Sequence, residues 1–136
     1  IVFETNEGGL NKLYSLNTST GKYQEIKGLS VGLVNNFDFT NDGKSLFFSQ
    51  STFDSSSDIY RLDLASNKIE RWTDSEQGEM QKSDMSAPKL IEWKSFDNMK
   101  ITGFYYPVSK KFTGKRPVLI NIHGGPEGQS MASSLR

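Results

Sequence analysis

Hydrophobic and polar residues alternate over short runs through the first eighty residues, with no helical periodicity. Turn-forming Asn, Asp, Gly and Ser residues separate the runs, and Thr40–Lys44 has the composition of a hairpin turn. The alternation predicts four consecutive short strands, over residues 37–39, 46–48, 58–64 and 68–72. We therefore expect an antiparallel sheet built from neighbouring hairpins.

The chain also repeats itself at an offset of 46 residues. The matched segments are Leu13–Asn17 with Ile59–Asp63, Gly21–Tyr23 with Asn67–Ile69 and, with one gap, Ile1–Phe3 with Leu46–Phe48. Four-stranded propeller blades repeat every ~40 to 50 residues. The repeat therefore favours β-propeller blades over other all-β folds.

A polar stretch without periodicity, residues 74–87, follows the repeat and indicates a domain boundary. Beyond it, two apolar-rich runs at Leu90–Lys94 and Lys100–Tyr106 enclose Phe96–Asn98, which predicts a second hairpin. We expect residues 1–86 to be about one and a half to two blades of a propeller, and residues 87–136 to begin another domain.

The chemistry of the chain is concentrated at His123-Gly124-Gly125-Pro126, directly behind the apolar run Val118–Ile122. The run predicts a buried strand, and glycines at its end allow the backbone N–H groups to approach a substrate closely. Such donors stabilise the oxyanion of acyl transfer, and in α/β-hydrolases a loop of this kind supplies one of them. We take Gly125, with Gly124, as the candidate donors. His123 either orients the loop through a side-chain hydrogen bond or is a buried residue with satisfied partners.

Composition excludes several other functions. Sixteen basic and sixteen acidic residues give zero net charge without a block of either sign, so we expect neither a nucleic acid nor a membrane as partner. No apolar run approaches the ~20 residues of a membrane span. The absence of Cys rules out disulfides and thiolate sites, and the single His rules out a His-rich metal site.

Three further motifs have simpler explanations. Gly28–Gly32 matches the G-x-S-x-G elbow around Ser30, but no helical pattern follows it, so we do not assign Ser30 as a nucleophile. Asn17–Ser19 fits a glycosylation sequon and is interpreted as a turn. Phe53–Asp58 lacks calcium-loop spacing and is interpreted as a solvated loop.

The repeat, the second hairpin and the run Arg116–Pro126 together resemble the prolyl oligopeptidase family (S9) of serine peptidases, in particular its acylaminoacyl-peptidase-like branch. The similarity covers nearly the whole chain, and Asn41–Lys44 resembles the family's blade turn, with Asn41 where many members have Pro. Asp97-Asn98 stands where relatives commonly have Asp-Gly.

The resemblance implies a mostly β fragment, made of the C-terminal blades of a β-propeller followed by the first strands of an α/β-hydrolase domain. It implies hydrolysis of short peptides through an acyl-enzyme, with no cofactor or metal, and Gly125 as oxyanion-hole donor. The family's Ser, Asp and catalytic His would lie beyond Arg136, in the remainder of the catalytic domain, so we expect this chain alone to be inactive.

Two alternatives remain open at this point: a carboxylesterase or lipase, and a non-catalytic propeller used for binding. The sequence specifies neither the cleavage-site preference nor the oligomeric state. It also leaves open the compartment of a soluble protein, whether periplasmic, secreted or cytoplasmic.

Overall fold

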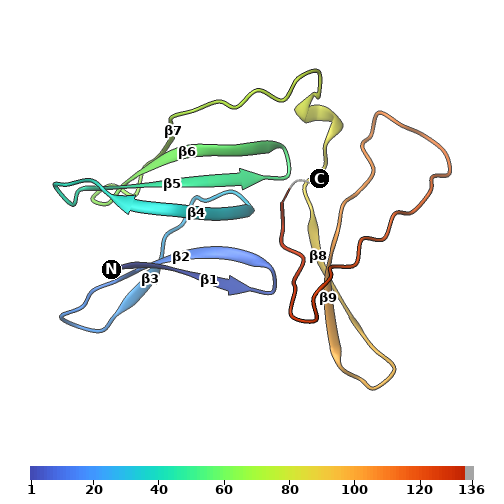
Figure 1. Cartoon of the computed structure of the whole chain (residues 1–136), viewed down its shortest axis with the longest axis horizontal. Coiled ribbons are helices and arrows are strands. Elements are labelled where there is room, and N and C mark those ends of the chain that lie inside the picture. The colour runs from blue at the N-terminus through green and yellow to red at the C-terminus, as the bar shows by residue number, and fades with distance from the viewer. Residues whose placement is uncertain (134–136) are drawn as a thin grey trace.

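The computed structural model describes residues 1–133, which form three antiparallel sheets of three, four and two strands. In chain order the elements are β1 (Val2–Glu7), β2 (Leu10–Leu16), β3 (Tyr23–Glu25), β4 (Gly32–Phe39), β5 (Ser45–Thr52), β6 (Ser55–Asp63), β7 (Ile69–Arg71), the 3₁₀-helix η1 (Lys82–Asp84), β8 (Lys89–Lys94) and β9 (Lys100–Tyr105). The first two sheets lie beside each other, and the β8–β9 hairpin lies beyond the β1–β2 turn (Figure 1).

The second sheet has the four strands that the sequence pattern predicts, in the order β4-β5-β6-β7. Its first hairpin turns at Asn41–Lys44, where Asp42 Oδ1 accepts hydrogen bonds from the Thr40 hydroxyl (2.6 Å) and the Lys44 N–H (3.0 Å). Gly43 adopts φ 67°, a conformation that glycine reaches without a steric penalty. The predicted hairpin is confirmed, and the hydrogen bonds to Asp42 and the conformation of Gly43 explain why the chain turns here.

The repeat of 46 residues is reproduced in the strand register. The pairs Tyr14↔Glu25 and Leu16↔Tyr23 of β2–β3 recur as Tyr60↔Arg71 and Leu62↔Ile69 of β6–β7. The structure also reproduces the one-residue gap in the match of Ile1–Phe3 with Leu46–Phe48, which makes Phe3 equivalent to Phe48. Phe3 stacks on Tyr14 at 5.5 Å between ring centroids, and Phe48 stacks on Tyr60 in the same way at 5.6 Å. Strands β1, β2 and β3 are therefore the equivalents of β5, β6 and β7.

The turns that follow β2 and β6 match in the same way. Asn17 Oδ1 accepts the backbone N–H groups two and three residues ahead (3.0 and 3.2 Å), and Asp63 Oδ1 does the same (3.2 and 2.8 Å). Each turn ends on a positive φ, at Gly21 (69°) and Asn67 (57°). The Asn17 side chain thus closes a turn, as expected from the sequence.

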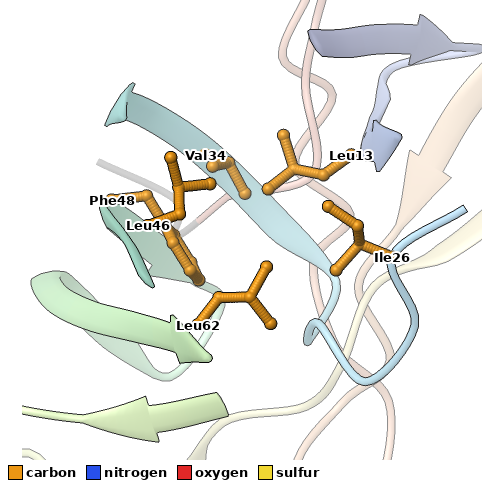
Figure 2. Packing of buried hydrophobic residues seen from close by; sticks show 6 residues of the cluster. All are labelled: Leu13, Ile26, Val34, Leu46, Phe48 and Leu62. Atoms are coloured by element: carbon orange, nitrogen blue, oxygen red, sulfur yellow. The ribbon is translucent and has the colours of Figure 1, made fainter. Parts of the chain in front are cut away.

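One hydrophobic core joins the first two sheets. Its six buried members, each at most 5% exposed, are Leu13, Ile26, Val34, Leu46, Phe48 and Leu62. Figure 2 shows Leu13 and Ile26 directed across the gap towards the residues of the second sheet. Burying each such side chain contributes roughly 1.5 to 3 kcal/mol. The core therefore holds the two sheets face to face, as neighbouring propeller blades are held.

The β8–β9 hairpin is also confirmed, with continuous pairing from Lys89↔Tyr105 to Lys94↔Lys100. Asn98 closes its turn at φ 66°, the left-handed conformation that Asn tolerates. Every residue of β8 is exposed, because no further strand or helix of the described residues covers it.

The expectation of a buried strand over Val118–Ile122 is wrong. Within the described residues 1–133, this run is irregular backbone. Its apolar side chains at 118, 119, 120 and 122 are 76–89% exposed. A strand needs neighbours to pair its N–H and C=O groups, and none of the described segments lies alongside this run. Apolar residues alone therefore do not form a strand at residues 118–122 without a partner to pair with.

The described residues are all-β, consistent with propeller blades, and they contain neither an α-helix nor a parallel sheet. The first strands of an α/β-hydrolase domain thus remain a prediction, as does the division at residues 86 and 87. No helix in residues 1–133 has the length and apolar character needed to cross a bilayer.

Candidate functional site

The predicted site residues His123, Gly124 and Gly125 lie together in an exposed turn behind the apolar run. Gly125 has φ 154°, and a Cβ there would lie 2.5 Å from the Glu127 nitrogen and 2.6 Å from the Gly128 nitrogen. A Cβ on Gly128 would lie 2.2 Å from the Gly124 oxygen. The turn therefore folds back on itself so closely that residues 125 and 128 must be glycine.

The backbone amides of this turn are available to a ligand. Within residues 1–133, the N–H groups of Gly124 and Gly125 donate no hydrogen bond, and both residues are exposed. Free backbone N–H groups are the kind of donor that can stabilise an oxyanion. The role of these amides as oxyanion donors stays a prediction.

His123 contacts the same turn. Its Nδ1 lies 3.0 Å from the Gly124 carbonyl oxygen, so a proton on Nδ1 would be donated to that oxygen. The alternative of a buried histidine is wrong, because the side chain is exposed. The contact fits a residue that orients the loop.

The described residues do not complete a catalytic site around the turn. No hydroxyl group of residues 1–133 is hydrogen-bonded to His123, so these residues hold no Ser–His pair. Ser30 lies in the loop between β3 and β4 and leads into a strand rather than a helix, which agrees with its rejection as a nucleophile. Within the same residues, no three His, Cys, Asp or Glu side chains gather as metal ligands.

Two cavities lie away from the glycine turn. One of about 330 Å³ is lined by Leu10–Lys12 and by the loop 25–32 that connects the first two sheets. The other, of about 280 Å³, lies between the turn at Phe53–Ser56 and the polar stretch after β7. Neither cavity contains a predicted site residue.

The most perturbed acid of the described residues is Asp58, which the sequence analysis had placed in a solvated loop. Residues 55–58 instead begin β6, and Asp58 is completely buried. Its carboxylate accepts hydrogen bonds from Ser55 Oγ (2.7 Å), Thr73 Oγ1 (2.9 Å) and the Ser75 N–H (2.8 Å). Arg71 Nη2 lies 2.5 Å from Asp58 Oδ2.

Burial raises the pKa of Asp58, but the hydrogen bonds from Ser55, Thr73 and Ser75 outweigh it and hold the pKa well below its usual range. The charged carboxylate ties the segment after β7 to β6, which is a structural role. The alternation puts Asp58 on the same face of the strand as Tyr60 and Leu62, but it does not reveal the partners that surround its carboxylate.

No family model and no curated protein matches the chain. Among solved structures, the chain is similar to one from a structural and mechanistic study of two prolyl endopeptidases that addresses inter-domain dynamics in catalysis and specificity. The two share 15% sequence identity at a TM-score of 0.65, over 80% of this chain and 16% of the other. The chain thus spans about a sixth of that protein's length, and its sheets have the same fold as that part of a prolyl endopeptidase.

Proposed function

We propose that this chain is a segment of a serine peptidase of the prolyl oligopeptidase family, acylaminoacyl-peptidase-like, that cleaves short peptides through an acyl-enzyme. Residues 1–86 would belong to its propeller and residues 87–136 would open its α/β-hydrolase domain. The observation that carries this proposal is the glycine turn with two free N–H groups, in a chain whose repeated sheets share the fold of a prolyl endopeptidase segment.

In this proposal the turn supplies electrostatic stabilisation. A serine outside residues 1–136 attacks the scissile carbonyl carbon, a histidine takes the serine proton, and the carbonyl oxygen becomes an oxyanion. The Gly125 N–H donates to that oxyanion, and loss of one such donor typically costs ~10² to 10³ in kcat. His123 holds the turn through the Gly124 carbonyl and is not the general base.

The exposed run Val118–Ile122 supports the same proposal. Its four apolar side chains are 76–89% exposed. Burying them would stabilise the protein by about 25 cal/mol for each Å² of apolar surface removed from water. Neighbouring strands of a larger sheet would bury them and pair their backbone. That sheet would come from the remainder of the catalytic domain.

The test is hydrolysis by the full-length protein that contains this chain. We expect it to cleave short peptidyl anilides, N-acylated ones included, and to lose this activity when treated with a serine-reactive fluorophosphonate. Turnover of p-nitrophenyl esters without any cleavage of peptidyl anilides would favour the carboxylesterase alternative. Absence of both activities and of fluorophosphonate labelling would favour a non-catalytic binding propeller.

A further inference from the structure

The turn between β1 and β2 contacts the segment that follows the glycine turn. Asn6 Nδ2 donates to Gln129 Oε1 at 2.7 Å and lies 3.6 Å from Met131 Sδ. The Ala132 N–H donates to the Gly9 carbonyl oxygen at 3.1 Å, and Ala132 is completely buried. Figure 1 shows this C-terminal segment, in red, beside the tip of the β1–β2 hairpin.

Gly9 makes this close approach possible. It is buried, with φ 89°, and a Cβ there would lie 2.7 Å from Phe104 Cε2 and 2.8 Å from the Ser130 oxygen. Asn6 serves both sides of the contact, because its Oδ1 accepts the Gly9 N–H at 2.8 Å while its Nδ2 reaches Gln129. A single side chain therefore closes the turn and binds the segment.

The same segment is held from its other side by the end of the β8–β9 hairpin. The Tyr106 hydroxyl, just after β9, donates to the Ser133 carbonyl oxygen at 2.6 Å. Residues 129–133 are thus fixed between a blade turn and the third sheet, although they have no secondary structure of their own.

The segment follows the candidate site directly in the chain. Gly128 packs against the Gly124 carbonyl so closely that a Cβ would lie 2.2 Å from it, and Gln129 follows immediately. A displacement of residues 129–132 would therefore act on Gly128, which packs against the turn that contains Gly125.

We propose that the Asn6–Gly9 turn is a docking site for residues 129–132, through which the propeller sheet positions the oxyanion donor of Gly125. Asn6 and Gly9 are positioning residues in this proposal and contact no substrate. The inference rests on the proposed function for its effect on turnover, but the docking itself does not. Because a misplacement of about 1 Å can cost ~10² in rate, a small shift of this segment is sufficient to matter.

The first test compares Gly9→Ala with Gly8→Ala in the full-length protein. Both glycines have positive φ, so both substitutions strain the turn, but a Cβ on Gly8 would meet only Leu90 Cδ2, at an ordinary 3.7 Å. We expect Gly9→Ala to accelerate hydrogen exchange of the Ala132 N–H, which donates to Gly9, about tenfold and to lower kcat about tenfold with KM little changed, whereas Gly8→Ala has much smaller effects. Equal effects of the two substitutions would overturn the inference.

The second test uses milder substitutions that leave the turn intact. Asn6→Asp keeps the acceptor for the Gly9 N–H, and rotation of the Gln129 amide lets its Nε2 donate to the carboxylate in place of the lost Asn6 donor. Gln129→Glu keeps the acceptor for Asn6 Nδ2, but the double variant places two carboxylates against each other. We expect each single variant to resemble the wild type, and the double variant to lower exchange protection of the Ala132 N–H and kcat about tenfold further than the two single effects combined. Additive effects would show that the two residues are not coupled.

The two readouts separate this inference from the proposed function. Coupled loss of exchange protection in a protein without peptidase activity would keep the docking site and overturn the proposed function. An active peptidase in which Gly9→Ala behaves as Gly8→Ala would keep the function and overturn the docking site.

Discussion

The substitution Gly125→Ala in the full-length protein tests the role of the glycine turn. The added Cβ would lie 2.5 and 2.6 Å from the nitrogens of Glu127 and Gly128. Ordinary non-bonded contacts of carbon lie at about 3.5 to 4.0 Å, so the backbone of the turn must move by about 1 Å. A shift of that size would displace the Gly125 N–H from the proposed position of the oxyanion.

We expect kcat for a peptidyl anilide to fall ~10² to 10³-fold, the loss measured when an oxyanion donor is removed. The KM should change little, because the donor acts on charge that develops only in the transition state, so kcat and kcat/KM should fall together. Steady-state kinetics of the purified variant give both values.

Two matched variants control for other effects of an added methyl group. Gly114 also has a positive φ (90°), but a Cβ there meets nothing within 4 Å, so Gly114→Ala should retain activity. A Cβ on Gly124 likewise meets nothing within 4 Å, so Gly124→Ala should cost far less than Gly125→Ala. Turnover of Gly125→Ala within a few-fold of the Gly114→Ala value would refute the reasoning.

Three further predictions concern stability. In the full-length protein, Asp58→Asn should lower the free energy of unfolding by about 3 kcal/mol, because Arg71 loses a buried partner. Asp74→Asn removes an 85%-exposed partner of Arg71 and should have little effect; denaturant titration of both full-length variants measures this. Since the pKa of Asp58 is lowered on folding, its contribution is complete above its unfolded pKa of about 3.9 and is lost as the pH falls below it, so wild-type stability should decline more steeply from pH 5 to 2 than that of Asp58→Asn. Residues 1–136 expressed alone should aggregate or unfold without a cooperative transition, because repeat arrays generally need about three units to bury a continuous core; a sharp two-state melt of a monomer would contradict this architecture.

Local sequence signals predicted the sheets well. The turns at Asn41–Lys44 and Asn98 and the 46-residue repeat all appear as expected, because each depends on residues close together in the chain. The Asn17 and Asp63 side chains close equivalent turns in the two sheets. The repeat therefore includes similar turn residues at matching positions as well as strands at matching spacing.

Features that depend on distant partners were predicted poorly. Asp58 is buried because Arg71, Thr73 and Ser75 return to it from beyond the next turn, so a polar run was mistaken for a solvated loop. The contact of Gly9 with Ala132 joins opposite ends of the described residues and has no local signal.

The prediction for Val118–Ile122 was wrong for a different reason. The composition of this run is that of a core strand, but no strand of the described residues pairs with it. The glycine turn behind it lies in an exposed part of the chain, and its role as an oxyanion site stays a prediction.

The most direct measurement of the central claim is a crystal structure of the full-length protein after reaction with a peptidyl phosphonate, whose phosphoryl oxygen mimics the oxyanion. We predict an adduct on a serine outside residues 1–136, with the Gly125 nitrogen about 2.7 to 3.1 Å from that oxygen. An adduct whose oxygen is bound by other groups, with the Gly125 N–H directed away from it, would contradict the account.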